Sequence, residues 1–193
     1  MTVNEVSGGH LVGAHGLFWD RQLVDWSPGS GRAWQLLGRR GINAPGLRLC
    51  DFREAAGVYI LYDDYGPQYT GIARSAGGLG ARLKQHDGNE PHGIKWNRFS
   101  WFTFDLVAAV DEDKKGWSRI DWRPDAFSVD VDVASRDVEA LLIKVLGLRS
   151  QNQMQFLNAY GWDQLLPWDA HDMVTKQQVD PTGFNYPYWE IWG

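Results

Sequence analysis

Hydrophobic and polar residues alternate along residues 57–73 as two β-strands joined by a tight turn require. In the first strand, Tyr59 and Leu61 fall on one face and their neighbours fall on the other. Turn-forming residues fill 63–67, and a second short strand follows at 68–73. The pattern therefore predicts a β-hairpin.

The spacing becomes helical after the hairpin. From Leu79 to about His86, leucines recur four residues apart, and so do Arg82 and His86. A third strand is predicted over 98–110, where β-branched and aromatic residues gather again. The order is then strand, strand, helix, strand.

The clearest helix of the chain is predicted to start at Ser135, a good N-cap. Its apolar positions repeat with the helical period, at Val138, Leu141, Leu142, Val145 and Leu146. Alternation over 129–133 predicts a short edge strand before this helix. Further helical patterns lie at 33–41 and 154–166.

Composition describes one folded domain, because 193 residues with 44% hydrophobic and 22% charged side chains suit a single core. We expect residues 1–52 and 161–193 to pack on the central unit, with the aromatic segment 184–192 largely buried. No run reaches the roughly 18 to 20 apolar residues of a membrane helix, and no signal peptide is recognisable. A lone Cys50 fits a reducing compartment, so we expect a cytoplasmic protein that does not associate with membranes.

A net charge of −5 argues against bulk attraction to nucleic acid. Residues 74–98 are the exception, with five basic and two acidic side chains. A surface fluctuation explains so small an excess unless a neighbouring motif makes use of it.

Two motifs, Gly57-Val58-Tyr59 and Tyr69-Thr70-Gly71, resemble the paired strands of the GIY-YIG nuclease superfamily. That family also carries an Arg on the next helix, a His or Tyr one turn later, a Glu on a later helix and then an Asn. The matching side chains here are Tyr59, Tyr69, Arg82, His86, Glu139 and Asn152. The resemblance covers residues 55–160. It implies an α+β core with a small three-stranded, mainly antiparallel sheet flanked by helices, to which 1–52 and 161–193 are additions.

By this resemblance the chain is a metal-dependent endonuclease that hydrolyses phosphodiester bonds of DNA. Tyr59 takes the proton from the attacking water, while Arg82 and one divalent metal ion stabilise the phosphate. Glu139 is the only protein ligand of the metal, and so sparse a site suits Mg²⁺ or Mn²⁺. Tyr69 positions phosphate or water, and Asn152 braces the site. We expect five of these side chains to converge on one cleft: Tyr59, Tyr69, Arg82, His86 and Glu139.

The residues expected to contact the nucleic acid are Gly71, Arg74, Lys84, Lys95 and Arg98. Many family members carry a polar residue directly after the Tyr-x-Gly motif, where this chain has Ile72. Arg74 or Lys84 could supply the missing charge, which would give the basic stretch a function. Because one modest basic face cannot hold a long duplex, a homodimer or a partner protein is a further expectation.

Two alternatives stay open. The chain could be a non-catalytic module that binds nucleic acid or protein, in which Arg82 is a solvated helix residue and Tyr69 a cross-strand packing residue. It could also be a structure-specific RNA enzyme. The combination of Tyr59, Arg82, His86 and Glu139 favours an enzyme, because a binding module has no physical need for all four.

Overall fold

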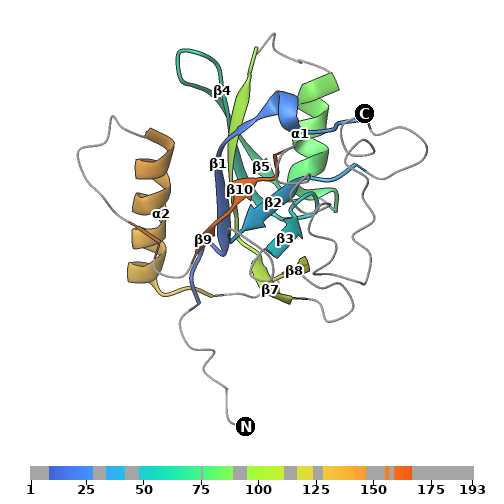
Figure 1. The fold of residues 1–193 in the computed structure, drawn as a ribbon. Helices are drawn as coiled ribbons and strands as arrows, with labels where there is room; N and C mark the ends of the chain where they lie inside the picture. The colour runs from blue at the N-terminus through green and yellow to red at the C-terminus, as the bar shows by residue number, and fades with distance from the viewer. Residues whose placement is uncertain are drawn as a thin grey trace.

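The computed structural model describes residues 9–27, 34–41, 48–74, 76–88, 95–110, 117–123, 128–146, 155–156 and 159–166. Its elements are β1 (Ala14–Asp20), the 3₁₀ turn η1 (Arg21–Leu23), β2 (Leu37–Arg40), β3 (Arg48–Asp51), β4 (Gly57–Tyr62), β5 (Pro67–Ala73), α1 (Gly78–Gly88), β6 (Arg98–Thr103), β7 (Leu106–Val110), β8 (Trp117–Asp121), α2 (Val131–Leu146), β9 (Tyr160–Gly161) and β10 (Asp163–Gln164). The described strands form two five-stranded sheets (Figure 1). Sheet A has the order β5-β4-β6-β1-β9, and sheet B has the order β10-β2-β3-β8-β7.

The predicted small three-stranded sheet is wrong. β4, β5 and β6 do form an antiparallel ladder, but β6 has a second edge, and β1 pairs with it there. Residues 1–52 therefore supply a strand inside sheet A, as well as β2 and β3 of sheet B. Both sheets are mixed, because β1 is parallel to β9 and β3 is parallel to β8. The fold is a sheet-rich α+β fold.

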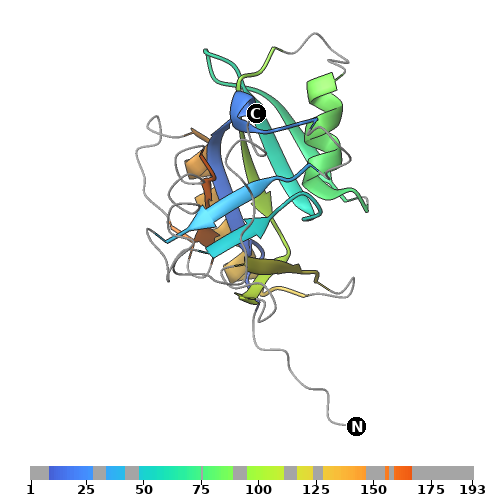
Figure 2. The same ribbon diagram turned by 45° about the vertical axis from the view of Figure 1, so that its right-hand side comes forward.

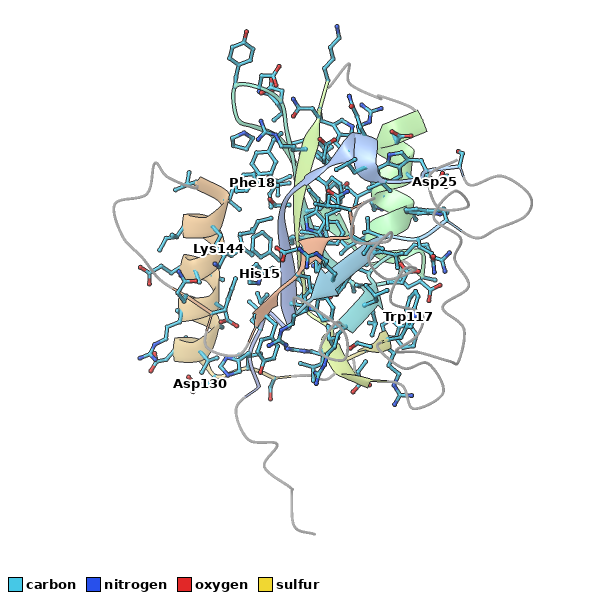
Figure 3. The ribbon with its side chains drawn as sticks, viewed as in Figure 1. His15, Phe18, Asp25, Trp117, Asp130 and Lys144 are labelled. Atoms are coloured by element: carbon cyan, nitrogen blue, oxygen red, sulfur yellow. The ribbon has the colours of Figure 1, made fainter. Side chains whose placement is uncertain are left out.

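Sheet A separates the two helices, which lie on its opposite faces (Figures 1 and 2). α1 packs Leu79 and Leu83 against the face that carries Tyr59. α2 packs Leu141 and Val145 against the other face, where side chains such as Ile60 gather. The alternation predicted for β4 is thereby confirmed. On the α2 side, His15 of β1 lies next to the helix that carries Lys144 (Figure 3).

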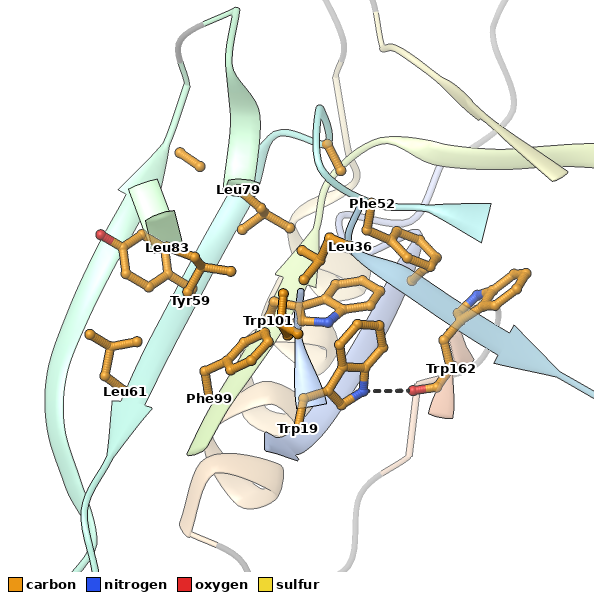
Figure 4. Close-up of a cluster of buried hydrophobic side chains, with 14 of the residues drawn as sticks. Trp19, Leu36, Phe52, Tyr59, Leu61, Leu79, Leu83, Phe99, Trp101 and Trp162 are labelled. Carbon is orange, nitrogen blue, oxygen red and sulfur yellow. Dashed lines mark hydrogen bonds between the residues drawn. The ribbon is translucent and has the colours of Figure 1, made fainter. Parts of the chain in front are cut away.

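An aromatic core fills the space between sheet A and sheet B (Figure 4). The rings of Trp19 and Trp101 meet edge to face with centroids 5.2 Å apart, and the ring of Phe52 lies tilted against Trp101 with centroids 4.2 Å apart. The indole N–H of Trp19 donates to the carbonyl oxygen of Trp162 at 3.2 Å. Aromatic rings of this size bury much apolar surface, so sheet B is held on the same face of sheet A as α1.

Local patterns predicted the centre of the chain well and its flanks badly. The hairpin β4–β5 and the helix α1 are confirmed. The predicted helix at 33–41 is wrong, since its described part contains strand β2. The predicted strand at 98–110 is two strands, β6 and β7, which belong to different sheets. The predicted helix at 154–166 is also wrong, because its described part carries β9 and β10.

The second helix begins earlier than predicted. The carboxylate of Asp130 accepts hydrogen bonds from the N–H groups of Asp132 and Val133, at 2.9 and 3.3 Å, so Asp130 rather than Ser135 caps α2. The predicted edge strand over 129–133 is therefore wrong. Neither of the described helices has the length and apolar character needed to cross a bilayer. Residues 184–192, predicted to be buried, lie outside the described residues.

Candidate active site

A tyrosine–histidine pair lies between sheet A and α1. The hydroxyl oxygen of Tyr59 is 2.9 Å from Nε2 of His86. Strand alternation turns Tyr59 toward α1, and helical spacing puts His86 on the same side of α1 as Leu79 and Leu83. Tyr59 is 2% exposed and His86 is 7% exposed. Two predicted site residues that are 27 positions apart thus make a direct side-chain contact.

Tyr69 completes a three-ring cluster. It lies on β5, directly across from Leu61 of β4. Its ring centroid is 6.1 Å from that of Tyr59 and 4.8 Å from that of His86. Tyr69 is partly buried and therefore more open to solvent than the other two rings.

Gly71 makes room for the tyrosine of this pair. It stands directly opposite Tyr59 in the β4–β5 ladder. A Cβ atom at Gly71 would lie 2.3 Å from both the hydroxyl oxygen and Cζ of Tyr59. Gly71 was predicted to contact substrate, but it is buried and faces the Tyr59 ring. The glycine of the Tyr-x-Gly motif thus has a steric function.

Burial raises the pKa of Tyr59 above its usual value, and the neighbouring Tyr69 adds to the effect. The positive charge of Arg82 opposes it and is too weak to reverse it. Tyr59 is therefore a neutral phenol near neutral pH. Its hydroxyl donates to Nε2 of His86 when the imidazole carries its own proton on Nδ1.

Arg82 lies one helical turn before His86 and is exposed. Its guanidinium donates to the side-chain oxygen of Gln85 at 3.3 Å, and its charge acts on Tyr59. A guanidinium in this position is accessible to a phosphate that approaches the rings, and its planar fork matches a pair of phosphate oxygens. Arg82 is the predicted basic residue that the structure brings to the pair.

Contacts that the sequence did not reveal fix α1 at both ends. At the start, the N–H groups of Leu79 and Gly80 donate to the carbonyl oxygens of Ala55 and Arg53, at 2.9 and 2.7 Å. Those N–H groups are thereby used within the protein and do not form the phosphate cradle that a Gly-rich loop could offer. At the end, the indole of Trp96 donates to the carbonyl oxygen of His86 at 3.4 Å.

Two of the basic residues predicted to contact substrate, Lys84 and Arg98, point away from the Tyr59–His86 pair. Lys84 is two residues from Arg82, about 200° around the helix, and its Nζ lies 5.4 Å from the ring of Trp34. Arg98 has the strand parity of Phe102, which belongs to the α2 side of sheet A. The two remaining basic residues predicted to contact substrate are both exposed, Arg74 and Lys95.

Glu139 lies on the other side of the sheet from Arg82. It is on α2, two residues from both Asp137 and Leu141, which contact the sheet side. It therefore points about 200° away from each, toward solvent, and it is exposed. The expectation that Glu139 shares a cleft with Arg82 and His86 is not met. Asn152 lies outside the described residues.

This geometry does not fit the metal ligand that the resemblance implies. A divalent ion held by Glu139 would be separated from the hydroxyl of Tyr59 by the full thickness of sheet A. Within the part of the chain that the structure describes, no three His, Cys, Asp or Glu side chains are grouped as metal ligands. Neither family models, nor curated proteins, nor solved structures provide a match to this chain.

Proposed function

We propose that this chain hydrolyses phosphodiester bonds of nucleic acid, with DNA as the first expectation, at the site formed by Tyr59, His86 and Arg82. The observation that carries the proposal is the 2.9 Å contact between the Tyr59 hydroxyl and Nε2 of His86, beside an exposed guanidinium. A tyrosine held by a base and flanked by a phosphate-binding cation is what attack by water on phosphorus requires.

Proton transfer in this proposal runs through both rings. The attacking water donates to the Tyr59 oxygen while the Tyr59 proton moves to Nε2 of His86. Nε2 of His86 lies 2.9 Å from the Tyr59 hydroxyl and can accept its proton, so His86 is the final base and Tyr59 relays the proton. Such a relay does not need a phenolate, which agrees with the raised pKa of Tyr59.

Arg82 has the electrostatic function. Negative charge grows on the non-bridging phosphate oxygens as water attacks, and a guanidinium stabilises that charge more than it stabilises the substrate. Tyr69, the more open of the two tyrosines, is suited to orient the phosphate through its hydroxyl. The leaving oxygen then takes a proton from solvent, and His86 returns its proton to water. No step is assigned to a metal ion, because Glu139 lies on the other face of sheet A.

The test is a cleavage assay with the full chain on supercoiled plasmid, single-stranded DNA and structured RNA. Each substrate is incubated with Mg²⁺, with Mn²⁺ and with a chelator. We expect the parent protein to cut at least one substrate and Tyr59→Phe to cut it about 10² to 10⁴ times more slowly, the range typical of lost general acid–base catalysis.

Tyr65→Phe is the matched control, because Tyr65 is 87% exposed in the turn between β4 and β5. It loses the same hydroxyl group away from the site and should cut at the parent rate. Absence of cleavage on all three substrates contradicts the proposal, and so does a Tyr59→Phe variant that cuts like Tyr65→Phe.

One observation favours a binding module instead of an enzyme. The Tyr59 side chain is 2% exposed, so water reaches its hydroxyl only if neighbouring side chains move aside. In a module, the same rings would only stabilise α1 against sheet A. Nucleic-acid binding without cleavage by the parent protein would support this alternative.

A further inference from the structure

Two arginines face each other at the end of the β2–β3 hairpin where the connecting segment joins the two strands. Arg40 and Arg48 are register partners in this antiparallel pair, so their side chains leave the same face of sheet B side by side. Arg48 is exposed and Arg40 is partly buried. Like charges directly opposite each other destabilise a sheet. The pair is therefore unfavourable for folding alone.

Among the described residues, no acidic side chain forms an ion pair with either of the two arginines, Arg40 and Arg48. Arg39 lies on the opposite face of β2, where it is the register partner of Asp163 of β10, and it donates to the carbonyl oxygen of Gly41 at 3.1 Å. In a protein of net charge −5, the side-by-side guanidinium groups of Arg40 and Arg48 create a local positive potential.

Tyr160 holds one of the two guanidinium groups in place. The guanidinium carbon of Arg40 lies 3.5 Å from the ring centroid of Tyr160, which is itself 54% exposed. Stacking on an aromatic face orients the guanidinium plane and lowers the entropy that Arg40 would lose on binding a ligand. The hydrogen-bonding edges of Arg40 can still reach an approaching anion.

The contact between Arg40 and Tyr160 and the Tyr59 site lie on the same face of sheet A. Tyr160 is the register partner of Ala14, Ala14 is also the partner of Thr103, and Thr103 is the partner of Gly57. Register partners point to the same face of a sheet, and Gly57 is two residues from Tyr59, so Tyr160 lies on the face that carries Tyr59. From β4 to β9 there are three inter-strand steps, a lateral distance of about 14 Å. Measured along the axis of a duplex, that distance spans about four phosphates of one strand, at about 3.4 Å of axis per phosphate.

We propose that Arg40 and Arg48, with Tyr160 orienting Arg40, form a second contact for the phosphate backbone of a nucleic acid, about four phosphates from the Tyr59 site. The inference rests on the proposed function for the choice of nucleic acid as ligand. The anion supplies the opposite charge that the described residues do not. Backbone binding of this kind fixes the position of the strand and is independent of base sequence.

The test measures binding of the full chain to fluorescently labelled duplex DNA, single-stranded DNA and structured RNA over a salt series. We expect Arg40→Gln/Arg48→Gln to weaken binding about 60-fold at 0.1 M salt and to make the salt slope shallower by about 1.8, the values for two lost phosphate contacts. Tyr160→Ala should weaken binding less, because Arg40 keeps its charge and loses only its orientation.

Arg119→Gln is the matched control, since Arg119 is an exposed arginine on β8. It should bind nearly as the parent does. The double variant should also unfold at the same temperature as the parent or at a higher one, because it relieves a like-charge pair. A weaker interaction with higher stability separates ligand binding from a structural function.

The results also distinguish this inference from the proposed function. If the parent binds none of the three nucleic acids at low salt, or if the double variant keeps the parent affinity and salt slope, the inference is wrong. If the double variant loses binding and the parent cuts nothing, the arginine contact stands and the hydrolytic function fails.

Discussion

Replacing Gly71 by alanine tests whether this glycine exists to make room for Tyr59. The new methyl carbon would lie 2.3 Å from the hydroxyl oxygen and from Cζ of the tyrosine. Ordinary contacts between carbon atoms are about 3.5 to 4.0 Å. The ring must therefore move by more than about 1 Å, which takes its hydroxyl out of hydrogen-bonding distance of His86.

The expected cost of this overpacking is about 1–3 kcal/mol of unfolding free energy. A decrease in the free energy of unfolding would be informative, because replacing glycine by alanine at an unobstructed strand position makes a protein more stable. The change should also slow cleavage nearly as much as Tyr59→Phe does, since both remove the contact between Tyr59 and His86. Urea unfolding and the plasmid assay measure the two effects on the same preparation.

Gly88→Ala is the control for a glycine without a steric function, because a Cβ atom at Gly88 would have no neighbour within 4 Å among the described residues. It should leave stability unchanged or raise it, and cleavage should stay at the parent rate. A double-mutant cycle with Tyr59→Ala then isolates the contact: Gly71→Ala should cost much less once the tyrosine ring is absent. If Gly71→Ala is as stable and as active as the parent, the steric argument is refuted.

Two further predictions concern the α2 side of sheet A. Burial, with a smaller effect of Lys144, lowers the pKa of His15 to about 4. Between pH 6.5 and 4 only the unfolded chain therefore takes up this proton, so the free energy of unfolding should fall by about 3 kcal/mol as the pH is lowered through that range. Urea unfolding of the parent and of His15→Phe measures this fall as the difference between the two proteins. Asp137 accepts from the Val12 N–H at 3.0 Å, so Asp137→Ala should cost about 1–3 kcal/mol in the same assay; a cost below about 0.5 kcal/mol would contradict this.

Elements defined by their own residues could be predicted from the sequence. In β4, strict alternation sorts Tyr59 from Ile60, and each faces the side that the pattern assigned. The strand β2 could not be predicted in this way, because its residues favour a helix locally. A Cβ atom at Gly38 would lie 2.8 Å from the ring of Phe52, so tertiary packing against the aromatic core decides this segment.

The orientation of α2 explains why Glu139 was misplaced. Hydropathy predicts that Val138, Leu142 and Leu146 face the core, yet they are 45%, 55% and 55% exposed. The helix instead turns Asp137, which is 3% exposed, toward β1. A buried carboxylate that caps a backbone N–H has no signature in a hydrophobic pattern.

The same distinction, between local patterns and the whole fold, separates the residues of the candidate site. Tyr59, Tyr69, Arg82 and His86 all belong to the hairpin β4–β5 and to α1, two elements that local patterns predicted correctly, and the structure brings them together. Glu139 depends on how a distant helix is rotated, which only the whole fold determines.

The most direct test of the account is the ratio of initial cleavage rates of His86→Gln and Glu139→Gln, measured side by side on the substrate that the parent cuts best. His86 accepts the proton in the proposed reaction, whereas Glu139 lies beyond sheet A. We expect Glu139→Gln to cut at the parent rate and His86→Gln to be slower by about 10² or more. A Glu139→Gln variant without activity beside an active His86→Gln variant would contradict the account.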